Sequence, residues 1–147
     1  MNVEIRPLRR EDKAAWEELW QLYLEFYEAS VAPQVTETTW RRLHDATEPV
    51  HGLGAVVSDQ LVGIVHYVLH RSTWTVGDYC YLQDLFTAQD LRGRGIGRAL
   101  IEAVYTHAKA AGASRVYWLT HETNTEARAL YDKVAQRSGF IQYRKVF

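Results

Sequence analysis

The chain has 147 residues, of which 47% are hydrophobic, and its formal net charge at pH 7 is −1. This length suits one hydrophobic core, so we expect a single domain over residues 1–147. The near-zero charge argues against nucleic acid or an anionic membrane as a partner, and a single cysteine excludes a disulfide framework or a cysteine metal cluster. Residues 1–13 lack the apolar segment of a secretion signal, and no run reaches transmembrane length, which predicts a soluble cytoplasmic protein.

The first half of the chain predicts a strand, two helices and a strand hairpin. Residues 3–8 alternate as a strand does, and residues 10–30 carry apolar side chains at the three- and four-residue spacing of an amphipathic helix. A second helix is predicted over residues 36–46. Residues 52–58 and 61–71 are apolar runs joined by a short polar turn, which indicates an antiparallel hairpin.

The second half predicts alternating strands and helices. Residues 78–87 indicate a third strand of the same sheet, and residues 96–111 a helix that begins directly after a glycine-rich loop. Residues 115–120 predict a strand, residues 124–138 a helix, and residues 140–147 a closing strand. This order predicts an α+β fold whose mixed sheet is antiparallel early and crosses over through a helix late.

The glycine-rich loop lies where glycine is unfavourable. Glycine costs about 1 kcal/mol relative to alanine inside a helix, so its use at a helix start indicates that the bare backbone is needed there. A helix start carries unpaired N–H groups and a partial positive charge, and nearby arginines add formal charge, which predicts a phosphate site. The glycines are Gly93, Gly95 and Gly97, and the arginines are Arg92, Arg94 and Arg98.

Spacing separates the known phosphate-binding motifs. A P-loop needs lysine after its last glycine, but Gly97 is followed by Arg98. A dinucleotide fingerprint starting at Gly93 or Gly95 would need glycine or alanine at Arg98 or at Leu100. The motif that remains is Arg-x-x-Gly-x-Gly, over residues 92–97.

This motif after "YLQDLFT", followed by "YWLTHETNTEARALYDKVAQRSGF", resembles the GNAT superfamily of acetyl-CoA-dependent N-acetyltransferases. The second stretch resembles the branch of small yeast histone and D-amino-acid acetyltransferases and their bacterial relatives. The resemblance rests on specific motifs over residues 78–147 and on element order alone over residues 1–72. It implies a GNAT-type central sheet that is mixed but mostly antiparallel and is flanked by helices. The sheet would be splayed where acetyl-CoA binds, and the reaction would use no metal.

The resemblance also implies roles for individual residues. The loop amides would hold the pyrophosphate of CoA, and the preceding strand would pair its backbone with the pantetheine arm. Asn124 matches the family's asparagine that contacts the pantetheine, and Tyr131 matches the tyrosine that protonates the departing thiolate. The loop residues are Arg92, Gly93, Arg94, Gly95, Ile96 and Gly97, with Arg98 beside them, and the strand residues are Leu85, Phe86 and Thr87.

Tyr131 follows Asn124 by seven residues, which is two helical turns, so both side chains should project from one helix face. The alternative is that Tyr131 is an ordinary core residue on an amphipathic helix with Ala127 and Leu130. The loop, Asn124 and the spacing together favour the catalytic role.

The general base is less defined. Some relatives carry a glutamate in the strand before the loop, where this chain has Gln83 and Asp84. Strand alternation predicts Asp84 on the face of Leu82 and Phe86, where burial would raise the pKa of its carboxyl, so Asp84 is either a base or a structural residue.

Other polar groups compete for the role of base. His121 and Glu122 follow a strand end and are further candidates, as is a water chain to solvent. His66 and His70 share a strand face, but no third ligand accompanies them, which argues against a metal site.

The resemblance implies an acceptor pocket where the N-terminal helices meet, and Tyr27, Glu28 and Trp74 are candidates to bind a cationic amine there. Amino acids, polyamines, aminoglycoside-like compounds and peptide lysines all remain open as acceptors. A non-catalytic acyl-CoA-binding module is the alternative to an enzyme, and a nucleotide-binding protein unrelated to CoA is a more distant one. We predict a homodimer, because residues 140–147 are apolar and relatives of this branch commonly dimerise through their C-terminal segments.

Overall fold

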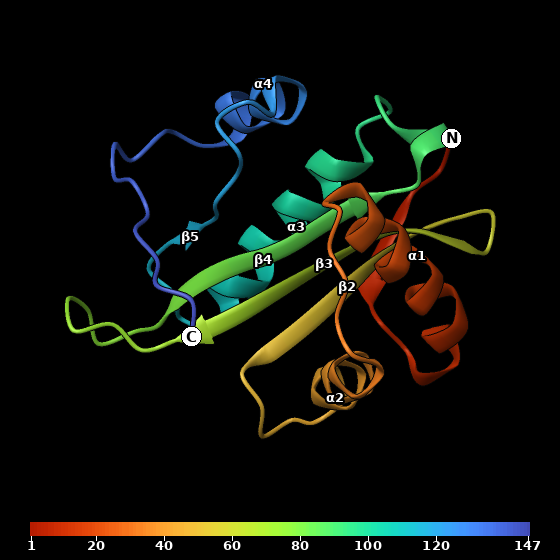
Figure 1. The fold of residues 1–147 in the computed structure, drawn as a ribbon, viewed down its shortest axis with the longest axis horizontal. Coiled ribbons are helices and arrows are strands. Elements are labelled where there is room, and N and C mark those ends of the chain that lie inside the picture. The colour runs from red at the N-terminus through yellow and green to blue at the C-terminus, as the bar shows by residue number, and fades with distance from the viewer.

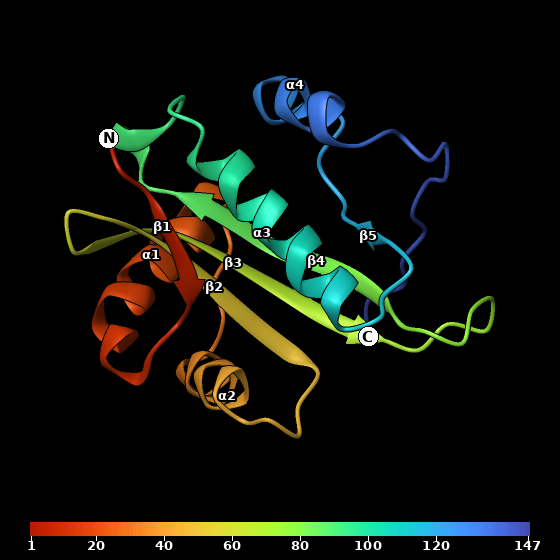
Figure 2. The same cartoon turned by 180° about the vertical axis from the view of Figure 1, so that it is seen from behind.

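The computed structural model describes residues 1–147 as a five-stranded sheet with helices on both faces (Figures 1 and 2). The strands lie in the order β1-β2-β3-β4-β5, antiparallel from β1 to β4 and parallel between β4 and β5. The parallel pair arises because a helix crosses over between its two strands. The expected α+β fold is confirmed, with strands Glu4–Pro7 (β1), Val50–Val57 (β2), Gln60–His70 (β3), Tyr79–Thr87 (β4) and Val116–Tyr117 (β5).

The four α-helices are divided between the two faces of the sheet. The first two lie on one face and the third on the other, with the fourth beside the third (Figures 1 and 2). The second helix begins three residues earlier than predicted, since Pro33 fits the first helical turn, where no N–H is needed. No helix is long and apolar enough to cross a bilayer. The helices are Lys13–Phe26 (α1), Pro33–Leu43 (α2), Ile96–Ala110 (α3) and Thr125–Val134 (α4), with 3-10 turns at Arg10–Asp12 and Gln89–Leu91.

Two apolar cores hold these layers together. The core between the sheet and α3 contains Val65, Leu82 and Leu100, all buried. The core between the sheet and α1 and α2 is aromatic, with Trp16 stacked on Trp20 at 6.2 Å between ring centroids. Neighbouring residues of β3 therefore face different cores, as strand alternation requires.

A β-bulge interrupts the pairing of β3 with β4. His66 pairs with Asp84, but Tyr67 pairs with Leu82, so Gln83 is an extra residue in β4. Leu82 belongs to the α3 core, whereas Asp84 pairs with a residue of the α1 face, as does Phe86. The prediction that Asp84 shares a face with Leu82 is therefore wrong, because simple alternation ignores the bulge.

The last third of the chain departs from the predicted strands. β5 is reduced to two residues, and residues 140–147 form no strand. A strand needs a neighbour along its length, and so short a β5 offers almost no ladder to a further strand. Phe140 is 87% exposed in consequence, together with Ile141, Tyr143, Val146 and Phe147.

Candidate active site

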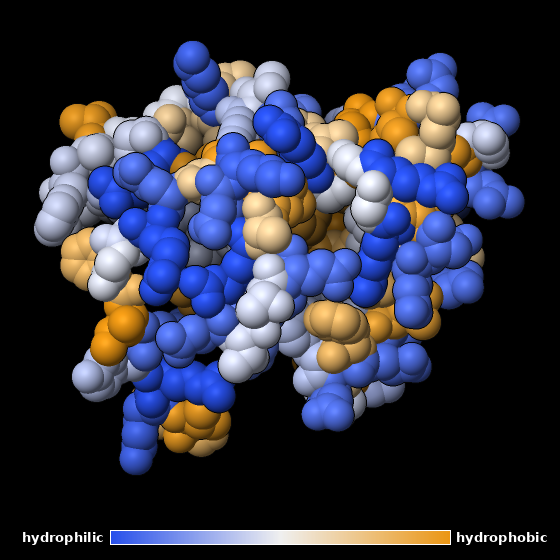
Figure 3. Space-filling model, turned by 90° about the horizontal axis from the view of Figure 1, so that it is seen from above, coloured by the Kyte–Doolittle hydropathy of each residue, from blue (hydrophilic) through white to orange (hydrophobic).

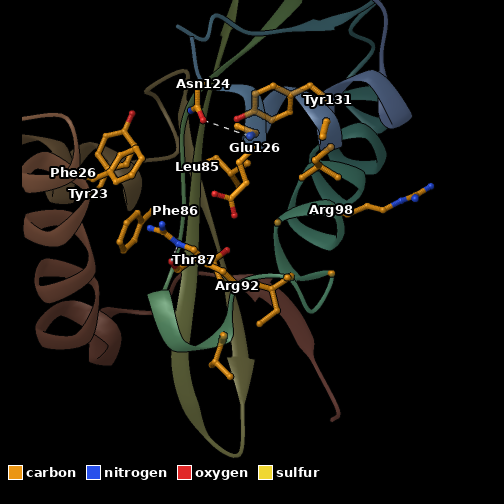
Figure 4. Close-up of a pocket in the computed structure, with 18 of the residues that line it drawn as sticks. Tyr23, Phe26, Leu85, Phe86, Thr87, Arg92, Arg98, Asn124, Glu126 and Tyr131 are labelled. Carbon is orange, nitrogen blue, oxygen red and sulfur yellow. Dashed lines mark hydrogen bonds between the residues drawn. The ribbon is translucent and has the colours of Figure 1, made fainter. Parts of the chain in front are cut away.

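A cavity opens where four elements converge: the end of α1, the end of β4, the glycine-rich loop with the start of α3, and α4 (Figure 4). Its volume is about 510 Å³, in the range of small-molecule sites. Seen from the side on which α4 lies, the surface is hollowed, with apolar side chains in the recess and hydrophilic ones around it (Figure 3). The elements that the sequence motifs mark therefore meet at one site.

The glycine-rich loop presents bare backbone to this cavity. Gly93 and Gly95 have φ angles of 78° and 84°, in the left-handed region that glycine adopts most readily, and Gly95 is the N-cap of α3. A Cβ atom at either position would meet nothing within 4 Å, so the space in front of the backbone is open. Ile96 and Gly97 continue the cavity wall. Open space before a helix N-terminus fits a phosphate group.

The arginines of the loop differ in where they lie. Arg92 donates from Nε to the Thr87 carbonyl oxygen at 3.1 Å, and its guanidinium lies 5.3 Å from the Phe26 ring centroid and 5.1 Å from that of Phe86. Arg92 is thus held between α1 and β4 by one hydrogen bond and two cation–π contacts.

The other two arginines are less directed at the cavity. Arg98 lines its edge but donates to Glu102 at 2.8 Å, and its guanidinium points outward (Figure 4). Arg94 is exposed and does not line the cavity, so its side chain adds no charge at the cavity wall, while the predicted role of its backbone amide stays a prediction.

The outer edge of β4 is open beside the cavity. Pairing with β5 stops at Tyr81, so the strand from residue 82 to residue 87 has no partner on that side. This is the splay that the family resemblance implies. Leu85, Phe86 and Thr87 line the cavity, and their edge can hydrogen-bond an extended ligand as a neighbouring strand would.

Asn124 and Tyr131 both line the cavity, as their spacing on α4 requires (Figure 4). Asn124 is the N-cap of α4, and its Oδ1 accepts from the Ala127 N–H at 3.4 Å, which leaves the amide group of the side chain free to donate. Tyr131 meets Trp118 edge to face at 5.3 Å. Burial, followed by the proximity of Tyr27, raises the pKa of Tyr131 to about 12, so its hydroxyl keeps its proton at neutral pH.

Asp84 lies behind the cavity wall rather than on it. Its side chain is 13% exposed, and Oδ2 lies 2.9 Å from Nδ1 of His66. Tyr23, which does line the cavity, lies close enough to Asp84 for the carboxylate charge to act on its hydroxyl. Burial first, and the negative charge of Asp84 second, raise the pKa of Tyr23 far above its usual value. Among the groups of the cavity wall, the Tyr23 and Tyr27 hydroxyls are therefore the ones on which the Asp84 charge acts.

A second, smaller cavity adjoins the first on the side of α1. The two share Phe26, Tyr27 and Asn124, and the smaller one adds Glu28 and His121. The ring centroids of Tyr27 and His121 are 6.1 Å apart, so α1 and the loop before α4 meet there. An anionic side chain beside aromatic rings suits a cationic group.

Two candidate residues lie elsewhere. Trp74 is 81% exposed in the β3–β4 loop and lines neither cavity, because this loop lies at the opposite end of β4 from Thr87. Glu122 also lines neither cavity, and its backbone carbonyl accepts from Arg128 at 2.6 Å.

Sequence reasoning missed Tyr23 as a wall residue and His66 as the partner of Asp84. Tyr23 precedes Tyr27 by four residues, so helical spacing alone would have placed both on one face. The pairing of His66 with Asp84 depends on the position of the bulge, which no local pattern marks.

Comparison with known proteins agrees with this geometry. The acetyltransferase (GNAT) family profile matches residues 16–135. The D-amino-acid N-acetyltransferase HPA3 of Saccharomyces cerevisiae is 33% identical over 98% of this chain and 91% of its own.

Solved structures share the fold. The ribosomal-protein-alanine N-acetyltransferase of Brucella melitensis superposes with a TM-score of 0.82 at 22% identity, covering 100% of both chains. The structure of AAC(6')-Iy with a CoA-containing bisubstrate analogue superposes with a TM-score of 0.84 at 16% identity, again covering 100% of both chains.

The matching family profile and the 33% identical relative define the class of protein as an acetyltransferase. The chain belongs to the acetyltransferase (GNAT) family and is a GNAT N-acetyltransferase. Membership implies acetyl-CoA as the donor and an amine as the acceptor.

Proposed function

We propose that the protein transfers an acetyl group to a primary amine of a small molecule or peptide by direct attack of the amine on the thioester. The observation that carries this proposal is the convergence, on one cavity, of an open helix N-terminus, an unpaired strand edge and the Tyr131 hydroxyl. Bound acetyl-CoA would supply the activated acetyl group. The residues that would hold it are those of the loop, the β4 edge and Asn124.

The protein's own groups have distinct parts in this reaction. As the new N–C bond forms and the C–S bond breaks, Tyr131 gives its proton to the leaving sulfur, since the raised pKa keeps that proton in place at neutral pH. The amine would lose a proton to the Tyr23 oxygen as the Tyr23 proton passes toward Asp84, whose charge acts on that hydroxyl. Solvent then restores both groups.

The acceptor would enter through the smaller cavity beside Tyr27 and Glu28. Because the relative that is 33% identical is named a D-amino-acid N-acetyltransferase, D-amino acids belong in any panel of acceptors. Polyamines, aminoglycosides and lysine peptides complete that panel.

An assay of thiol release from acetyl-CoA with each amine tests the proposal, with an amine-free reaction as the control for hydrolysis. Amine-dependent thiol and acetylated product are expected together. CoA binding by calorimetry without thiol release for any amine would instead favour the non-catalytic acyl-CoA-binding module.

Replacing Asp84 with asparagine is expected to lower kcat/KM about tenfold, because the amide cannot accept the proton passed from Tyr23. The control is Asp59→Asn, which removes the same charge in an exposed left-handed turn (φ 64°) that asparagine tolerates. Full activity of the Asp84 variant would leave water as the base.

We also propose that the protein is a homodimer. The support is the exposed apolar segment 140–147 beside the short β5, which a second copy can cover. Light scattering should give twice the 17.0 kDa chain mass at micromolar concentration, and deletion of residues 140–147 should lower it to that of one chain. A monomer mass for the full chain would contradict the proposal.

A further inference from the structure

His66 is a buried histidine with a partner on each ring nitrogen. It is 2% exposed on the α1 face of β3. Its Nε2 lies 2.9 Å from the indole Nε1 of Trp16, and its Nδ1 lies 2.9 Å from Oδ2 of Asp84. These three residues form a line from the aromatic core to the carboxylate behind the cavity.

The chemistry of the indole fixes where the imidazole proton lies. An indole N–H can only donate, so Nε2 of His66 must accept and cannot carry a proton. The ring is therefore neutral with its proton on Nδ1, and this N–H donates to Asp84. The contact between His66 and Asp84 is a hydrogen bond to a carboxylate rather than an ion pair.

The Trp16 indole is held by its neighbours in the position that bonds to Nε2 of His66. It is 0% exposed and lies between Trp20 and Trp40, with ring centroids at 6.2 and 4.8 Å. A rotation of the indole away from Nε2 would displace both neighbours.

We propose that Trp16 and His66 are positioning residues that hold Asp84 in place as an uncompensated anion facing Tyr23. The proposal rests on the role of Asp84 in the proposed function. An imidazolium at His66 would cancel the carboxylate charge that draws the amine proton through Tyr23, and the indole N–H prevents that protonation.

None of the other groups around Asp84 carries a positive charge that pairs with its carboxylate. Tyr23 and Tyr27 of α1 and Tyr81 of β4 are neutral hydroxyls whose pKa values are raised by burial first and by the Asp84 charge second. The loop cation Arg92 lies against two aromatic rings instead, and Asp84 forms no ion pair with lysine or arginine.

Nitrogen NMR of the wild-type protein with labelled histidine tests the tautomer without any activity measurement. The His66 ring is assigned by its contact with the Trp16 indole proton. The expected result at pH 7 is an unprotonated Nε2 and a protonated Nδ1. A proton on Nε2 at pH 7 would overturn the proposal.

Replacing Trp16 with phenylalanine removes the donor to Nε2 and also leaves a small cavity where the larger indole packed. The indole no longer prevents a proton on Nε2 of His66 in this variant, so kcat/KM at pH 6 should drop about fivefold relative to wild type and recover by pH 8. The matched control is Trp20→Phe. Trp20 lies in the same core, but its indole N–H donates to Thr36 Oγ1 at 3.3 Å rather than to His66.

Superimposable pH profiles for the two tryptophan variants would overturn the proposal. If Trp16→Phe does not fold, the wild-type NMR result still decides the tautomer. If Asp84→Asn is fully active while His66 shows the expected tautomer, the role of Asp84 in catalysis fails but the proton arrangement holds.

Discussion

Replacing Tyr131 with phenylalanine is expected to lower kcat about a hundredfold and to leave CoA affinity nearly unchanged. The phenyl ring keeps the contact with Trp118 and the packing against the α3 core, so only the hydroxyl proton is lost. Steady-state kinetics with any accepted amine, together with calorimetry of CoA binding, measure the two quantities separately.

A matched control comes from the same side of the sheet. Tyr105 on α3 donates its hydroxyl to the Val134 carbonyl at 2.8 Å and does not line the cavity. Tyr105→Phe should therefore reduce thermal stability and leave kcat unchanged. Wild-type turnover by Tyr131→Phe would assign the proton on sulfur to water and make Tyr131 a core residue.

The pH dependence follows from the direction of the Tyr131 shift. Because the pKa is raised to about 12, the neutral hydroxyl persists across the usual assay range, and its alkaline limb lies above that range. The profiles of wild type and Tyr131→Phe should run parallel below about pH 10. The stability that this shift contributes is present below the unfolded value of about 10 and is lost as the pH rises through about 12.

Local sequence signals were sufficient for most of the fold. The spacing of apolar residues in α1, the Ser58–Asp59 turn between β2 and β3, and the glycine loop before α3 each depend on neighbouring residues only. These elements occur where they were expected, and the crossover through α3 follows from their order.

The errors have a common physical origin in contacts between distant segments. The face of Asp84 depends on the bulge at Gln83, which is set by the pairing of β4 with β3. Residues 140–147 alternate like a strand but lack a partner within the chain. Trp74 was assigned to the acceptor site because it is aromatic, although its loop lies at the wrong end of β4.

The same limit applies to the site. The glycine motif and the spacing of Asn124 from Tyr131 identified one part of the cavity wall, since each lies within one loop or one helix. The link from Trp16 through His66 to Asp84 joins residues 50 and 18 positions apart, and only the folded chain brings them together.

The second large effect is expected at the glycine loop, where Gly95→Val should lower CoA affinity by a few kcal/mol, about a hundredfold or more. The branched side chain would occupy the open space in front of the α3 N-terminus, where the pyrophosphate is proposed to bind. Strain is a competing cause, because φ is 84° and a β-branched residue disfavours that conformation.

Gly112→Val separates these two causes. Gly112 has a φ of 85°, also faces open space, and follows the other end of α3 outside both cavities. Both variants should lose similar thermal stability, since each forces a left-handed valine at one end of the same helix. Only Gly95→Val should lose CoA binding by calorimetry. Equal affinities for the two folded variants would place the pyrophosphate away from this loop, because nothing but the location of the side chain distinguishes them.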